Sequence, residues 1–134
     1  MHSMFRVPPL LYRGLFVFAL VVVFWLALQP APDVIQIVSW QDKVEHAVLF
    51  AVLMVLGNLA WPGRMLPVVL GLLAYGAAME VAQSFTDYRF GDLWDWIADA
   101  IGLLIAAFPA RQLASRFGAH PVPSADHSGA RNQA

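Results

Sequence analysis

Four long apolar stretches alternate with short polar or proline-containing segments along the chain. They cover about Leu10 to Leu28, Ala47 to Trp61 after the polar start DKVEH, Met65 to about Phe85, and Asp92 or Leu93 to about Leu113. Each approaches the roughly 20 residues that a helix needs to cross a hydrocarbon core. Backbone groups in lipid need internal partners, so these stretches should be helices. We therefore predict an all-α membrane protein, a compact antiparallel bundle of four transmembrane helices.

The same pattern divides the chain into a predicted cytoplasmic segment at 1–9, a four-helix membrane domain at 10–113 and a flexible polar tail at 114–134. The tail is predicted because the sequence beyond Phe117 is polar, small and proline-containing. Arg6 and Arg13 precede the first apolar run, as basic residues precede a secretory signal. No small-x-small cleavage site follows, so we expect an uncleaved first helix.

Composition agrees with a membrane protein. Of the 134 residues, 60% are hydrophobic and 13% charged, and the mean hydropathy is +0.63, whereas a soluble domain is about a quarter charged. The net charge of -1 lacks the basic excess of a nucleic-acid-binding protein, so no nucleic acid partner is expected. Without cysteine, disulfides, zinc thiolates and thiol nucleophiles are excluded.

The lysines and arginines are distributed unequally between the two sides of the predicted bundle. One side would carry Arg6, Arg13, Arg64, Arg111, Arg116 and Arg131, and the other only Lys43 and Arg89. Cytoplasmic loops are enriched in basic residues. We therefore predict a multi-pass protein of the bacterial cytoplasmic (inner) membrane, in contact with the lipid bilayer, with both termini in the cytoplasm.

This topology brings polar residues from three separate stretches to the outer face. They are Asp42, Lys43 and His46 in the second helix, Glu80 and Gln83 in the third, Arg89 in the loop, and Asp92, Asp95 and Asp99 in the fourth. Spacings of three and four place the residues of each helix on a common face. An ionised carboxylate in lipid costs about 3 kcal/mol, so Asp99 should face the bundle interior, a partner or a wet cavity. We predict a polar cluster at the outer face.

The polar motifs resemble those of the VanZ-like family of small bacterial membrane proteins. The matching elements are DKVEH at 42–46, EVAQ at 80–83, and Arg89 followed by DLWDWIADAIG at 92–102. The family pattern is Asp-Lys-x-x-His, then Glu-x-x-Gln, then Arg followed by a polar residue, an Asp and a later Asn or Asp before Gly. The resemblance covers about residues 42 to 108. Asp99 stands where many relatives have Asn, and Asp92 where a smaller polar residue is frequent.

The resemblance implies a cell-envelope role, since the family is named after a protein associated with low-level resistance to the glycopeptide teicoplanin. Our first hypothesis is a binding protein for an envelope component, such as a lipid-linked precursor or a head group. The candidate ligand-binding residues are Asp42, Lys43, His46, Glu80, Gln83, Arg89, Asp92, Asp95 and Asp99. Arg89 could bind phosphate or carboxylate through two parallel hydrogen bonds, but the carboxylates outnumber the cations.

That acidic excess motivates a second hypothesis, a membrane-embedded enzyme. A divalent metal is a candidate cofactor, with Asp42, His46, Glu80, Asp95 and Asp99 as candidate ligands. The enzyme would be a metal- or histidine-assisted hydrolase or transferase, with His46, Glu80 and Asp95 as candidate catalytic residues. We favour the non-enzymatic hypothesis, because no ligand spacing is diagnostic. A third hypothesis gives the cluster a purely structural role as an ion-pair network.

Overall fold

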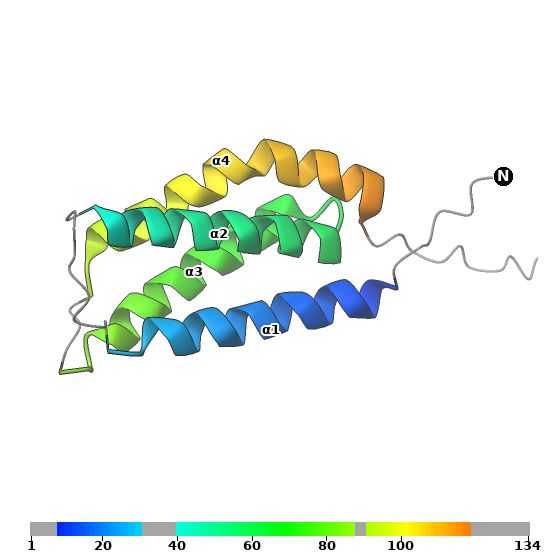
Figure 1. Cartoon of the computed structure of the whole chain (residues 1–134). Coiled ribbons are helices and arrows are strands. Elements are labelled where there is room, and N and C mark those ends of the chain that lie inside the picture. Colours follow the sequence, from blue (N-terminus) through cyan, green and yellow to red (C-terminus); the bar gives the residue numbers. More distant parts are fainter. Residues whose placement is uncertain (1–7, 31–39, 88–90, 119–134) are drawn as a thin grey trace, which may run out of the picture.

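The computed structural model describes residues 8–30, 40–87 and 91–118, which form four helices and no strand within these ranges. The helices are α1 (Pro9–Ala27), α2 (Gln41–Ala60), α3 (Met65–Gln83) and α4 (Leu93–Phe117) (Figure 1). Each is long and apolar enough to cross a membrane. For the described residues, the prediction of an all-helical protein with four such helices is confirmed.

Residues with special backbone properties begin and separate the helices. Pro9 lies in the first turn of α1, where its missing N–H would have no intrahelical partner. Between α2 and α3, Gly63 adopts a positive φ of 78°, which glycine tolerates better than any residue with a Cβ. At the start of α4, the carboxylate of Asp92 accepts a 2.9 Å hydrogen bond from the backbone N–H of Trp94, which makes Asp92 the N-cap.

The fourth helix is longer than its apolar pattern predicts. It passes through Pro109 and ends at Phe117, beyond the expected end at Leu113 and inside the range assigned to the tail. Ala114 is buried, and a Cβ on Gly118 would clash with both Ala114 and Pro62. Packing against the turn between α2 and α3 therefore orders the last turn of α4.

Helix α2 contacts all three other helices, most extensively α4, whereas α1 and α3 barely touch. A Cβ on Gly102 would clash with the backbone carbonyl of Ala47, so the backbones of α4 and α2 lie in close contact at this position. Small residues allow such close approach between membrane helices. The close contact between α2 and α4 sets the relative positions of the polar side chains that these two helices carry.

An apolar core fills the space among the helices. Its most deeply buried large side chains are Phe50, Leu53, Met54, Leu72, Met79 and Leu103. Many large apolar side chains point outward instead, including Phe18 and Trp25 on α1 and Ile105 and Phe108 on α4. Such extensive exposed apolar surface is unusual for a soluble monomer, and it is the surface that a chain surrounded by hydrocarbon would present.

Candidate functional site

The polar residues of α2 and α4 form two layers of ion pairs, one helical turn apart. In the first layer, the Nζ of Lys43 donates to Asp95 Oδ1 at 2.8 Å and to Asp92 Oδ2 at 3.0 Å. The Asp95 side chain is 8% exposed, while those of Lys43 and Asp92 are 36% and 40% exposed. This layer therefore lies at the edge of the cluster that water or a head group can reach.

In the second layer, His46 Nδ1 lies 2.9 Å from Asp99 Oδ1, and both side chains are buried. An Nδ1–H would donate to the ionised carboxylate, which fixes the ring of His46 against α4. His46 follows Lys43 by three residues and Asp99 follows Asp95 by four, so the second pair lies one turn deeper along both helices. The Asp99 side chain has no exposed surface.

Asp92 connects the start of α4 to the end of α3. Its backbone N–H donates a 2.8 Å hydrogen bond to Glu80 Oε2. Its carboxylate lies outside the helices, and the N–H of Trp94, together with the ammonium of Lys43, lowers the pKa of this carboxyl below its ordinary value. Asp92 therefore stays ionised at neutral pH and holds Lys43 in place.

Two buried carboxylate oxygens accept no hydrogen bond within residues 8–30, 40–87 and 91–118: Glu80 Oε1 and Asp99 Oδ2. Asp99 Oδ2 faces Gly76, where an added Cβ would lie only 2.7 Å away. Gly76 precedes Glu80 by one turn and shares its helical face. The cluster thus contains unused acceptors in its buried half. Because a buried acceptor without a partner is costly, these oxygens indicate a place for a cation or a proton.

The buried half also has the donor set of a metal site. His46, Glu80 and Asp99 offer ligand atoms that lie within 4.8 Å of one another, as do those of His46, Asp42 and Asp95. His46 belongs to both groups. Imidazole suits zinc and iron, and carboxylates suit magnesium, calcium and manganese, so a mixed set of this kind fits zinc or manganese. All five candidate metal ligands from the sequence are therefore brought together.

The two remaining predicted ligand-binding residues are Gln83 and Arg89. The amide of Gln83 is buried and donates a 3.0 Å hydrogen bond to the carbonyl of Ala27, which ties the end of α3 to the end of α1. Arg89 falls outside the described residues. Among the described residues of the cluster, only Lys43 and His46 can carry a positive charge. Lys43 is already shared by the carboxylates of Asp92 and Asp95.

Gly76 was not among the site residues predicted from the sequence. Because it has no side chain, it lets α3 approach Asp99 closely. The signal was present, since Gly76 lies four residues before Glu80 on the same face, but glycine is too common in membrane helices to stand out.

The described part of the chain thus contains four potential membrane spans and a buried acidic cluster beneath an accessible ion pair. No protein-family model, curated protein or solved structure matches the chain. The chemistry of the cluster itself therefore has to indicate the function.

Proposed function

We propose that this chain is a multi-pass membrane protein of the bacterial cell envelope that binds an envelope component at the polar cluster. In this proposal the four helices form an antiparallel bundle with the cluster at its outer face and both termini in the cytoplasm. The excess of Lys and Arg at the opposite end supports that orientation. The resemblance to the VanZ-like family supports the envelope role.

The observation that carries the proposal is the pair of buried carboxylate oxygens, Glu80 Oε1 and Asp99 Oδ2, that accept no hydrogen bond within the described ranges. Next to them stands His46, whose partner Asp99 is inaccessible to water. A bulky head group cannot reach Asp99. A divalent cation fits the ligand set formed by His46, Glu80 and Asp99.

A bound cation also explains how an acidic cluster would take an anionic ligand. Lys43 is already paired with Asp92 and Asp95, so it has little charge left for a phosphate. Metal ions commonly bridge one or two carboxylates to a substrate phosphate. We therefore infer that a head group, such as the phosphate of a lipid-linked precursor, binds from the side of Lys43 and Asp92 and that the buried cation neutralises the carboxylates beneath it.

Thermal unfolding in detergent tests the cation site. A cation that binds only the folded protein raises the melting temperature, by the equivalent of about 2.7 kcal/mol at a hundred times its dissociation constant. We expect Mn²⁺ or Zn²⁺ to stabilise the chelator-treated protein, and Glu80→Gln to weaken this effect by at least about tenfold in affinity, since even indirect partners of a metal contribute about that much. The matched control is Asp87→Asn, because Asp87 is exposed.

A stabilisation that Glu80→Gln leaves intact would show that the cation binds elsewhere. No stabilisation of the unmodified protein by either metal would refute the cation site. Binding of a head group is tested separately, by adding a polyprenyl phosphate with and without the metal. The proposal requires that the lipid phosphate binds more tightly when the metal is present.

Catalysis is the second candidate function. It is favoured by the position of His46, which lies close both to Glu80 and Asp99 and to Asp42 and Asp95. Water would attack the terminal phosphorus and form a new P–O bond, while the anhydride P–O bond breaks and polyprenyl phosphate leaves as an anion. His46, whose Nδ1 faces Asp99, would accept the proton of the water at Nε2, so in this reaction the neighbouring carboxylates alone would hold a metal, which would supply charge neutralisation at the phosphate. Phosphate release from a polyprenyl diphosphate, lost in His46→Gln, tests this reaction. Absence of release with bound metal would leave binding as the function.

The layer formed by Lys43, Asp92 and Asp95 supports a structural role for that part of the cluster. These ion pairs join α2 to α4 directly, and the contact holds His46 opposite Asp99. We infer that the outer layer fixes the geometry and that the buried layer binds the ligand.

A further inference from the structure

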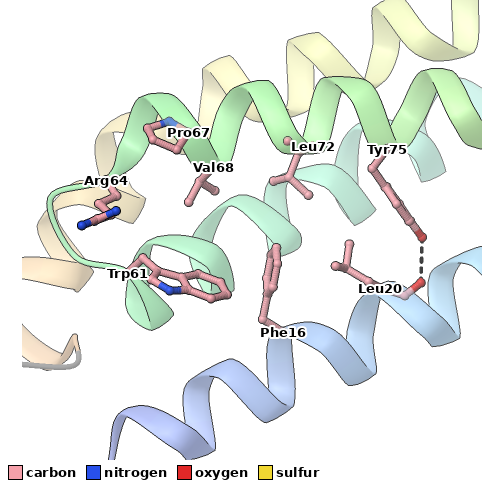
Figure 2. Close-up of a pocket in the computed structure, with 9 residues that line it drawn as sticks. Phe16, Leu20, Trp61, Arg64, Pro67, Val68, Leu72 and Tyr75 are labelled. Atoms are coloured by element: carbon pink, nitrogen blue, oxygen red, sulfur yellow. Dashed lines mark hydrogen bonds between the residues drawn. The ribbon is translucent and has the colours of Figure 1, made fainter.

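A second feature lies between α1 and α3, and none of its lining residues belongs to the polar cluster. Because these two helices make few contacts with each other, they leave a partly open groove of about 300 Å³ between them (Figure 2). Its walls are almost entirely apolar and include Phe16, Val68, Leu72 and Tyr75. A volume of this size is at the lower end of the range for small-molecule sites.

The two ends of the groove differ chemically. At one end the hydroxyl of Tyr75 donates a 2.7 Å hydrogen bond to the carbonyl of Leu20, which joins α3 to α1 and closes the groove (Figure 2). At the other end stand Trp61 and the exposed Arg64. The guanidinium of Arg13 lies 5.5 Å from the centre of the Trp61 ring. The groove is therefore apolar along its length and cationic at its mouth.

The length of the groove matches one leaflet of a bilayer. Arg64 and Tyr75 are separated by eleven positions of α3, which correspond to about 16 Å at 1.5 Å per residue. The hydrocarbon core of a bilayer is about 30 Å thick, so one leaflet contributes about half of that. An acyl chain that starts at the mouth would reach the closed end near the middle of the membrane.

From this geometry we propose that the groove holds one acyl chain of an anionic phospholipid. The phosphate of this lipid is bound by Arg64, with Arg13 beside it, and the chain lies against Phe16, Val68 and Leu72. The charge of the mouth selects the occupant, because basic residues at a membrane surface attract anionic lipids. This site shares no lining residue with the polar cluster, and its mouth at Arg64 lies at the opposite end of α3 from Glu80.

The test is native mass spectrometry of the full chain in detergent with an equimolar mixture of phosphatidylglycerol and phosphatidylcholine. We expect about a fivefold preference for phosphatidylglycerol, the effect of one basic contact with an anionic lipid. Arg64→Gln should remove most of the preference, whereas Arg111→Gln, an exposed arginine on α4, should keep it. Equal retention of the two lipids by the unmodified chain would overturn the proposal.

A second variant fills the groove without straining the fold. Gly71 lines the groove, and an added Cβ there would meet nothing within 4 Å, so Gly71→Leu should fold and exclude the acyl chain. Gly14→Leu on α1 is the matched control, because that position is equally open and does not line the groove. Loss of bound lipid in Gly71→Leu alone supports the proposal. Unchanged lipid binding in Gly71→Leu would overturn it. If the native chain is a dimer that Gly71→Leu converts to a monomer, the proposal is also overturned, because a second copy of the chain would then cover the groove.

Discussion

Lys43 holds two carboxylates that would otherwise repel each other across the contact between α2 and α4. Asp95 is buried and accepts a 2.8 Å hydrogen bond from this ammonium. Removing one partner of a buried pair leaves an uncompensated charge. The energetic importance of Lys43 therefore comes mainly from Asp95, because Asp92 also has the N–H of Trp94 as a partner.

We predict that Lys43→Met destabilises the protein by about 1 to 2 kcal/mol, a value reduced from that of a fully buried pair because water screens the exposed side of Lys43. Asp95→Asn in the same chain should recover much of the loss. The measurement is the free energy of unfolding in detergent for both single variants and the double variant. Additive effects of the two substitutions would show that the pair contributes nothing as a pair.

The stripe of polar and small residues on α4 shows what helical spacing can predict. Asp92, Asp95, Asp99 and Gly102 were expected on one face, and each of them contacts α2. The individual partners, Lys43, His46 and Ala47, could not be predicted. They depend on how α2 is rotated about its axis and shifted along α4, and packing determines both.

The close contact between α2 and α4 depends on the absence of a side chain at Gly102. We predict that Gly102→Ala lowers the free energy of unfolding by about 1 to 3 kcal/mol, because the new methyl group would clash with the carbonyl of Ala47. Gly14→Ala is the control, since a Cβ at Gly14 has open space around it. Both substitutions replace a helical glycine with alanine and gain about the same helix propensity. The difference between their free energies of unfolding therefore reports the clash.

Equal stability of the two alanine variants would contradict the close contact. Metal binding of Gly102→Ala gives a second measurement, because separating α2 from α4 also separates His46 from Asp99. We expect this variant to bind Mn²⁺ or Zn²⁺ more weakly than the Gly14→Ala control.

The extent of the helices was largely predictable from apolar runs and their proline and glycine boundaries. The end of α4 was not, because Gly118 lies against Pro62 of a turn that is distant in sequence, and no local pattern indicates this contact. Neither was the groove between α1 and α3. Its mouth residue Trp61 looks in sequence like the last residue of an apolar run, and only the poor packing of two helices makes it line a cavity.

The orientation of the whole molecule is a prediction that two single-cysteine variants can test. The native chain contains no cysteine, so labelling has no background. Ser84 and Ser115 are exposed and lie at the end of α3 near the cluster and at the far end of α4. We expect a membrane-impermeant maleimide to label Ser84→Cys on intact spheroplasts and Ser115→Cys only after permeabilisation. The reverse pattern would place the cluster in the cytoplasm.

The metal content of the purified protein tests the central claim most directly. The full chain would be stripped with a chelator, dialysed against Mn²⁺ or Zn²⁺ and then against metal-free buffer, and analysed by mass spectrometry of the elements. Binding at His46, Glu80 and Asp99 predicts an equimolar amount of retained metal, which the double variant Glu80→Gln/Asp99→Asn loses and Asp87→Asn keeps. A native chain that retains no metal, or a double variant that retains as much as the native chain, would contradict the account.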